Sequence, residues 1–449
     1  MLLFYFWVSM KPDVDHARAA SSGPISRKLL FFYGLPMTGA SMLNFLTGTY
    51  LMKYATDVLF IGSLTMGMIF LGARIWDAIN DPICGYLSDH TTSRMGRRRL
   101  WIAASAIPTG VLFYFLWTPA ENYKILWMII AIPVFYTALT AFYIPHYSLG
   151  AELSADYHDR NRIYGNRALW ENIGNFLGVA VLQMVIFEPG SGATAKEVTP
   201  WVMGGVGIFT IAVIWIMVLK TPRGQDQTSA KHGIFKTYGA VLKNRQARSI
   251  LIVGFFSQVG GAIILTATFY YTEYILNAPG SEAIVIGLFM LAATLSIPGW
   301  IFIAKRVDKL KLWMGANITA ALIFIFTMYL SAGDVVQMAI LATIAGVAAG
   351  AIIMINPAAL ADTISSDGVQ ENQSREGTYF ALYTFINKSA MGFSAALLGV
   401  VLWWGGYIAN VEQTYESALA IRTLYAFGPA VAFSIAAVFL YRYMRLKKN

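Results

Sequence analysis

Apolar runs long enough to cross a lipid bilayer recur along nearly the whole chain, separated by short polar segments. A membrane-spanning helix needs about 20 mainly apolar residues, and each of these runs reaches that length. The pattern predicts an all-α membrane protein with twelve membrane-spanning helices. The expected spans cover residues 29–56, 63–88, 100–119, 123–152, 167–188, 200–220, 247–276, 281–304, 312–332, 335–363, 379–404 and 420–443.

The longest polar connection on the basic side separates the sixth expected span from the seventh. Two helical halves joined in this way are typical of transporters that enclose a site near the middle of the membrane. We therefore expect two six-helix bundles. The expected segments are an N-terminal stretch at 1–27, bundles at 28–220 and 247–443, a linker at 221–246 and a tail at 444–449.

Composition supports a membrane protein, because 57% of the residues are hydrophobic and only 13% are charged. Soluble domains average about 25% charged residues. The net charge of +9 comes from lysines and arginines in alternate loops, such as 91–99 and 305–311, and in the tail. This distribution argues against a nucleic-acid partner and, by the positive-inside rule, predicts that both termini are cytoplasmic.

Several other classes of protein find little support. Cys84 is the single cysteine, which excludes an internal disulfide bond. No zinc-type His-Glu-x-x-His or nucleophile-type Gly-x-Ser-x-Gly signature occurs, so we do not expect an enzyme. Residues 1–10 are apolar but too short to span, and we expect them to lie outside the fold. A passive channel or a receptor remains an alternative.

The second expected span contains two carboxylates, Asp77 and Asp81, with Asn80 between them. An ionised Asp at mid-membrane costs about 2.5–3.5 kcal/mol, so such residues usually face a polar interior. Positions i, i+3 and i+4 share one helix face, which predicts a cation site. The alternative is an ordinary ion pair with Arg74. Lys388 either competes with the cation or forms a permanent salt bridge to these carboxylates.

The run from Ala73 to Pro82 (ARIWDAINDP) strongly resembles the second helix of the glycoside-pentoside-hexuronide:cation symporter family, a branch of the major facilitator superfamily. Further matches are the Tyr50-Leu-Met, Thr56-Asp-Val and Ile144-Pro segments and Lys388. The resemblance implies a twelve-helix fold and a transported cation bound by Asp77, Asn80, Asp81 and Thr140. Carboxylate, amide and hydroxyl oxygens suit Na⁺, with H⁺ and Li⁺ as alternatives.

The resemblance also implies where a sugar binds. Two carboxylates that contact sugar in family members carrying melibiose are replaced here by Ser41 and Tyr143, whereas Tyr147 and Arg167 match an aromatic and an arginine at the sugar site. His146 lies in the same segment, and the resulting positive site suits a carboxylated sugar. Alternatively, Arg167 pairs with an acidic residue four positions later and His146 only packs.

The segment after the second span resembles the superfamily's loop between helices two and three. That loop is associated with closing the cytoplasmic side. The resemblance implies a cytoplasmic gate made by Gly85, Asp89, Arg94, Gly96 and Arg97.

Together these features predict a symporter that imports a glycoside, sugar or sugar acid by alternating access, driven by a monovalent cation. Lys388 and Arg74 couple cation binding to the conformational change. We expect a monomer in the lipid bilayer of a bacterial-type inner membrane. The alternatives are a proton-coupled sugar symporter or a lysophospholipid-type carrier on the same fold, since a distant animal branch of the family shares the helix-two motif.

Overall fold

The computed structural model describes residues 25–154, 157–186, 192–223, 244–371 and 376–446. Every element within these ranges is an α-helix or a short 3₁₀-helix, which confirms the predicted all-α class. Most of the expected N-terminal segment and linker, and residues 447–449, lie outside the described residues.

Three consecutive helices form the first span of the first bundle. Pro36 opens the second of them and has no N–H to continue the preceding hydrogen-bond ladder. Leu35 and Tyr50 at the two junctions keep helical φ and ψ angles, so the pieces form one rod. The bundle comprises α2 (Arg27–Gly34), α3 (Pro36–Thr49), α4 (Leu51–Asp57), α5 (Ser63–His90), α6 (Arg97–Leu116), η2 (Glu121–Tyr123), α7 (Lys124–Glu152), α8 (Tyr157–Ile186) and α9 (Gly192–Lys220).

The second bundle begins with a capped helix. The side chain of Asn244 accepts hydrogen bonds from the backbone N–H groups of Gln246 and Ala247, which otherwise lack partners at a helix start. Asp308 caps a later helix in the same way. This bundle comprises α11 (Arg245–Tyr274), α12 (Glu282–Ala304), α13 (Lys309–Phe326), η3 (Thr327–Tyr329), α14 (Val335–Glu371), α15 (Glu376–Trp404) and α16 (Tyr415–Leu446).

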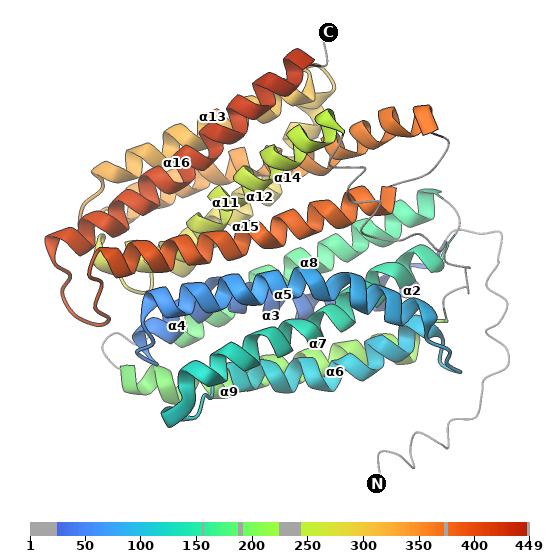
Figure 1. Cartoon of the computed structure of the whole chain (residues 1–449), viewed down its shortest axis with the longest axis horizontal. Coiled ribbons are helices and arrows are strands. Elements are labelled where there is room, and N and C mark those ends of the chain that lie inside the picture. The colour runs from blue at the N-terminus through green and yellow to red at the C-terminus, as the bar shows by residue number, and fades with distance from the viewer. Residues whose placement is uncertain (1–24, 155–156, 187–191, 224–243, 372–375, 447–449) are drawn as a thin grey trace.

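The two bundles lie one above the other in Figure 1, with α5 of the first facing α15 of the second. Near the beginning of α5 these helices touch: a Cβ atom at Gly399 would lie 2.5 Å from the carbonyl oxygen of Ser63, and one at Gly67 would lie 2.9 Å from that of Ala395. Toward the end of α5 the ribbons diverge (Figure 1). We call the end where α5 begins and α15 ends the contact end, and the opposite end the splayed end.

Within the first bundle, glycines allow close helix contact. A Cβ atom at Gly110 of α6 would lie 2.6 Å from the Gly207 carbonyl oxygen of α9, and the reverse distance is also 2.6 Å. Membrane helices gain stability from close backbone approach at small residues, because lipid supplies no hydrophobic drive between them. The two glycines therefore set the α6–α9 spacing.

Hydropathy alone identifies ten of the described helices as candidate spans. The long helices α5 and α8, of 28 and 30 residues, are not among these candidates. Helix α8 also begins at Tyr157, ten residues before the expected start at 167. Its first turns are polar and precede the apolar run, so the helix begins earlier than the span expected at 167–188.

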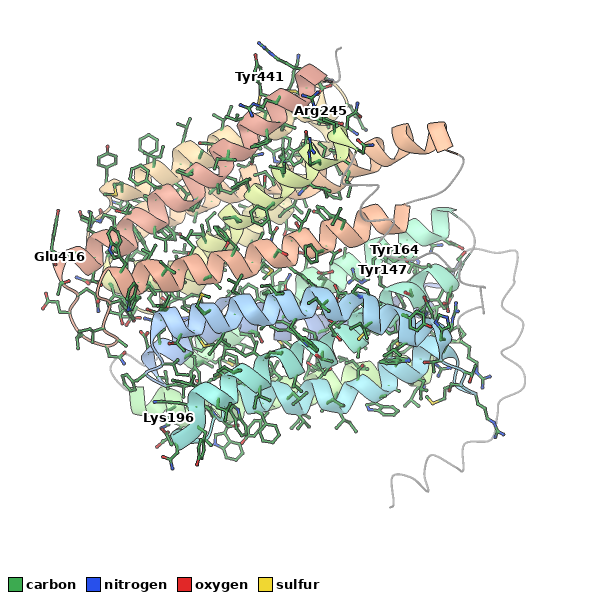
Figure 2. All side chains as sticks on the ribbon, in the orientation of Figure 1. Tyr147, Tyr164, Lys196, Arg245, Glu416 and Tyr441 are labelled. Atoms are coloured by element: carbon green, nitrogen blue, oxygen red, sulfur yellow. The ribbon has the colours of Figure 1, made fainter. Side chains whose placement is uncertain are left out.

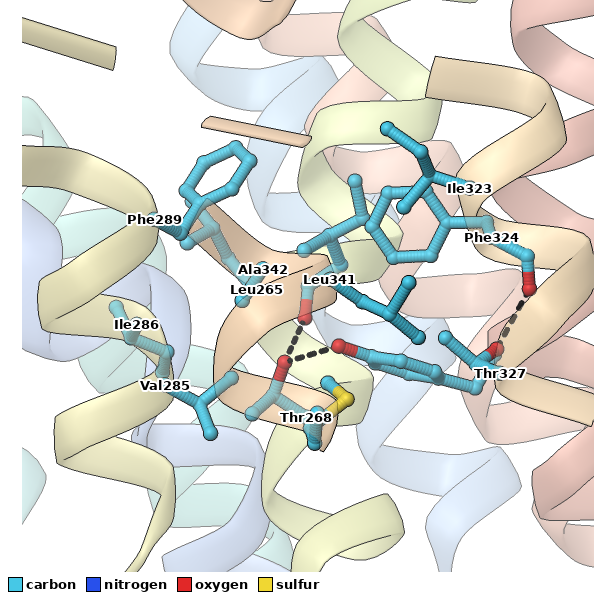
Figure 3. Close-up of a pocket in the computed structure, with 13 residues that line it drawn as sticks. Leu265, Thr268, Val285, Ile286, Phe289, Ile323, Phe324, Thr327, Leu341 and Ala342 are labelled. Atoms are coloured by element: carbon cyan, nitrogen blue, oxygen red, sulfur yellow. Dashed lines mark hydrogen bonds between the residues drawn. The ribbon is translucent and has the colours of Figure 1, made fainter. Parts of the chain in front are cut away.

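A small apolar cavity lies inside the second bundle (Figure 3). Thr268 of α11 and Tyr425 of α16 share a 3.0 Å hydrogen bond in its otherwise apolar wall. No residue that lines this cavity comes from the first bundle or carries a charge. The cavity is thus separate from the charged groups on α5. Other lining residues are Val285, Phe289, Phe324 and Leu341.

We expect Gly207→Ala to lower the melting temperature of the purified protein, whereas Gly205→Ala on the same helix leaves it unchanged or raises it. Overpacking at a tight contact costs about 1–3 kcal/mol. A Cβ atom at Gly205 would meet nothing within 4 Å, and alanine favours a helix over glycine by about 0.5–1 kcal/mol. Thermal unfolding in detergent measures both variants; a Gly207→Ala protein as stable as the parent would contradict the close contact.

Candidate functional site

The charged face of α5 is buried. Asp77 and Asn80 are 2% and 4% exposed, and the Asp81 side chain is 16% exposed. One helical turn separates the two carboxylates, as the sequence pattern predicted, and both project from α5 toward α7 and α15. Such groups need polar partners, because burying a carboxylate without them is costly.

Lys388 of α15 supplies the main partner. Its ammonium Nζ lies 2.7 and 2.8 Å from the two carboxylate oxygens of Asp81 and 3.1 Å from Asp77 Oδ1. The ammonium thus bridges both carboxylates. Because α5 and α15 belong to different bundles, this ion pair also joins the two halves of the molecule.

Thr140 of α7 completes the polar contacts between the carboxylates. Its hydroxyl oxygen lies 2.8 Å from Asp77 Oδ1 and 3.2 Å from Asp81 Oδ1. One hydroxyl proton donates to one acceptor at a time, so the hydroxyl also has lone pairs available. Two carboxylates and a hydroxyl together form an oxygen-rich group of the kind that hard cations prefer.

Arg74 contributes the second positive charge. Its guanidinium nitrogen lies 3.5 Å from Asp77 Oδ2, and the group stacks 4.2 Å from the ring centroid of Tyr136 on α7. A Cβ atom at Gly392 of α15 would lie 2.8 Å from Arg74 Cβ, so α15 presses closely against this side chain. With Lys388, two positive groups balance two carboxylates.

Asn80 faces elsewhere. Its amide oxygen accepts a weak hydrogen bond from the Cys84 thiol at 3.6 Å, and its buried Nδ2 has no partner among the described residues. The structure therefore brings together Asp77, Asp81 and Thr140 but not the amide of Asn80. A rotation of that amide would be needed for it to join them.

A second polar cluster lies between α7 and α8. The rings of Tyr147 and Tyr164 stack at 4.7 Å, and the guanidinium of Arg167 lies 5.3 Å from the Tyr147 ring (Figure 2). Arg167 also pairs with Glu171 at 3.3 Å, as the alternative interpretation predicted. Tyr147 is 52% exposed. Sequence reasoning missed Tyr164, although its position three residues before Arg167 places it on the same helix face.

Tyr143 lies on α7 between the two clusters. It is half-buried and comes three residues after Thr140 and four before Tyr147, so the three side chains share one helix face.

Ser41 and His146 do not join these clusters. The Ser41 hydroxyl lies within hydrogen-bond distance of two backbone carbonyl oxygens, one of them that of Glu171 at 3.0 Å, and the residue is 3% exposed. His146 is fully buried and stacks on Tyr33 at 4.5 Å. Its Nε2 lies 2.9 Å from the Tyr33 carbonyl oxygen. Neither side chain has surface to offer a substrate in this conformation.

The residues expected at the gate are tied to the first bundle. Asp89 pairs with Arg98, whereas Arg97 contacts Glu152 at the end of α7 at 2.7 Å. Arg98 Nε lies 3.1 Å from the same Glu152 carboxylate. Sequence reasoning missed both Arg98 and Glu152. Gly96 has φ of 89°, which favours glycine, Arg94 is exposed and Gly85 lies near Ile144.

Comparison with known proteins identifies the family. A family model described as MFS/sugar transport protein matches residues 32–446. The chain belongs to this family. The isoprimeverose transporter of Lactiplantibacillus pentosus is 27% identical to it over 424 residues, covering 92% of this chain and 88% of that protein.

A second relative is named for a lipid substrate rather than a sugar. The sodium-dependent lysophosphatidylcholine symporter 1-B of Danio rerio is 25% identical over 480 residues, covering 96% of this chain and 90% of that protein. Among solved structures, a bacterial homologue of the lysosomal transporter Spinster has a TM-score of 0.66 at 14% identity, covering 93% of this chain and 96% of that one. The chain is a major facilitator symporter, not an enzyme, and a multi-pass membrane protein.

We expect Lys388→Met to lower the melting temperature in choline chloride at neutral pH, because removing one partner of a buried ion pair costs about 3–5 kcal/mol. Lowering the pH restores stability, since protonation neutralises the carboxylate that Lys388 no longer balances. The double variant Asp81→Asn with Lys388→Met serves as the control and melts close to the parent. A single variant that melts like the parent from pH 6 to pH 8 would contradict this account.

Proposed function

We propose that this symporter couples the uptake of a sugar, glycoside or sugar acid to a monovalent cation that binds at Asp77, Asp81 and Thr140. The observation that carries the proposal is the position of the Lys388 ammonium between the two carboxylates, at 2.7–3.1 Å. A positive group already occupies the place where a cation would bind. The donors suit Na⁺, and two adjacent carboxylates also accept a proton.

Charge balance prevents the Lys388 ammonium and the transported cation from occupying the site together. Asp77 and Asp81 are balanced by Arg74 and Lys388, so an added cation gives the cluster a net positive charge. Like unit charges 4 Å apart repel by about 4 kcal/mol at an effective dielectric constant of 20. The incoming cation therefore displaces Lys388 and breaks the ion pair that joins the two bundles. Asn80 then turns its amide oxygen toward the cation.

The same displacement links the cation to the substrate. Freeing Lys388 from Asp81 lets α15 move relative to α5, and Tyr143 lies on the face of α7 between the carboxylates and the Tyr147–Arg167 cluster. If the cation favours the conformation that binds substrate, then substrate favours cation binding by the same factor. Arg74 stays with Asp77 and limits the charge that the cation must neutralise.

Aromatic and charged groups support a sugar as the substrate. The exposed face of Tyr147 offers a surface for the apolar face of a sugar ring, while Arg167 and Glu171 offer hydrogen bonds to hydroxyls. The Arg167 guanidinium, which pairs with Glu171, is also the kind of group that binds a sugar carboxylate. A lysophospholipid is the second candidate, on the strength of the Danio rerio relative.

Basic loops support an orientation with both termini cytoplasmic in a bacterial-type inner membrane. The contact end then faces outward and the splayed end inward. In this orientation the conformation described here faces the cytoplasm. The residues around Asp89 and Arg98 lie on the inner side, where a cytoplasmic gate would act.

We expect NaCl, compared with choline chloride at equal ionic strength, to raise the melting temperature of the parent but not of Asp81→Asn. A ligand that binds only the folded state stabilises it by about 2.7 kcal/mol at a hundredfold excess over Kd. LiCl and a pH series separate the alternative ions. Asp308→Asn is the matched control, because it removes an exposed carboxylate but keeps a helix cap.

The same variant tests coupling in proteoliposomes. Asp81→Asn should abolish uphill accumulation driven by an inward sodium gradient, while Asp308→Asn retains it. Full uphill uptake by a folded Asp81→Asn protein would refute the cation site.

For the substrate, we expect Tyr164→Leu to weaken the apparent affinity for the transported sugar about 2- to 12-fold, the equivalent of an aromatic pair worth about 0.5–1.5 kcal/mol. Tyr164→Phe keeps the stacked ring and retains most of the affinity. Tyr441→Leu, an exposed tyrosine of α16 (Figure 2), is the control. Uptake in sodium, with sugars, uronic acids and lysophospholipids as competitors, provides the readout; competition by lysophospholipids alone would overturn the sugar assignment.

A further inference from the structure

A buried ionic cluster joins the two bundles at the contact end. Lys53 of α4 is 8% exposed, and its ammonium contacts Asp57 of the same helix and lies 2.6 Å from Glu273 Oε2 of α11. The ammonium also lies 4.8 and 4.4 Å from the ring centroids of Tyr270 and Tyr274. One lysine of the first bundle is therefore enclosed by groups of the second.

Asp57 is held from the second bundle as well. Its carboxylate accepts hydrogen bonds from the hydroxyls of Tyr407 at 2.7 Å and Tyr274 at 2.9 Å. Its backbone carbonyl accepts one from the side chain of Asn410 at 2.6 Å. Asp57 is 5% exposed. All these partners lie on α11 or just after α15, so each bond crosses the interface between the bundles.

Negative charge is in excess around Lys53. The ammonium contacts two carboxylates, those of Asp57 in the first bundle and Glu273 in the second. Without the lysine these two carboxylates would repel one another, so the lysine's charge favours contact between the bundles at this end.

We propose that Lys53, Asp57 and Glu273 form a lock that holds the outer side of the transporter closed, and that the lock must open before substrate reaches the central site from outside. The assignment of this end to the outside rests on the proposed function. Opening exposes the ions to water, which solvates the separated charges and removes the penalty of leaving them unpaired in a buried site. The lock therefore has two stable arrangements, closed and dry or open and hydrated.

The experiment reads opening directly and needs neither substrate nor cation. Ser63 at the start of α5 is 8% exposed and lies under Gly399 of α15. In a Cys84→Ser background, Ser63→Cys gives one reporter thiol that a membrane-impermeant maleimide reaches only when the contact end opens. Labelling is measured from the outside of right-side-out vesicles and, separately, from inside-out vesicles.

We expect Glu273→Gln to speed outside labelling about 3- to 10-fold, a tenfold change in the open fraction being equivalent to about 1.4 kcal/mol. Lys53→Met should have at least as large an effect, and the double variant should label no faster than Lys53→Met, because both changes break one lock. Glu121→Gln is the matched control: Glu121 pairs with Lys196, but both belong to the first bundle and are exposed.

Unchanged outside labelling in folded Glu273→Gln and Lys53→Met proteins would overturn the lock. Faster labelling from the inside alone would overturn its outer position. Folding is checked by monodisperse elution and by the native Cys84, 3% exposed, which stays unreactive in the same variants without the reporter. Labelling requires neither substrate nor cation, whereas the cation site is tested by melting and uptake. An error in the cation site and an error in the lock therefore give different results.

Discussion

The burial of two carboxylates inside a membrane helix constrains much of this structure. Asp77 and Asp81 require positive partners, and the nearest ammonium comes from the opposite bundle on α15. That helix must approach α5 closely for Lys388 to reach both oxygens. Glycine at 392 permits the approach, since a larger residue would collide with Arg74. The electrostatic requirement of one helix thus fixes the contact between two bundles.

The proposed coupling to an ion requires no chemical change and relies on the energetics of this ion pair. A buried ion pair contributes little net stability, because desolvation offsets most of the Coulombic attraction, yet the loss of one partner is strongly unfavourable. Lys388 therefore leaves Asp81 readily only when another positive charge takes its place. Replacing Lys388 with another positive charge at Asp81 thus changes the free energy little. A small change suits a transport cycle in which both conformations must be populated.

The sequence contained enough information for the spans and the carboxylate cluster but not for the ends of helices. The length of an apolar run reflects the thickness of the bilayer. Helix α8 extends beyond its apolar run through polar turns, so the sequence placed the start of the helix too late. Asp77, Asp81 and Lys388 stood out because charge is rare inside a span. Glu152 and Glu273 lie near helix ends, where charge is common, and only tertiary contacts distinguish them.

Two ionic contacts join the bundles at different depths in the membrane. Lys388 pairs with Asp77 and Asp81, and Lys53 pairs with Glu273. Asp81 lies 18 residues after Ser63 on α5, a distance of about 27 Å at 1.5 Å per residue, and Ser63 marks the contact end where Lys53 meets Glu273. When two rigid bundles rotate apart at one end of the molecule, their other ends move little or come closer together. Under the proposed coupling, a cation that competes with Lys388 would break only the contact between Lys388 and the two carboxylates, while the Lys53 lock would still hold the contact end.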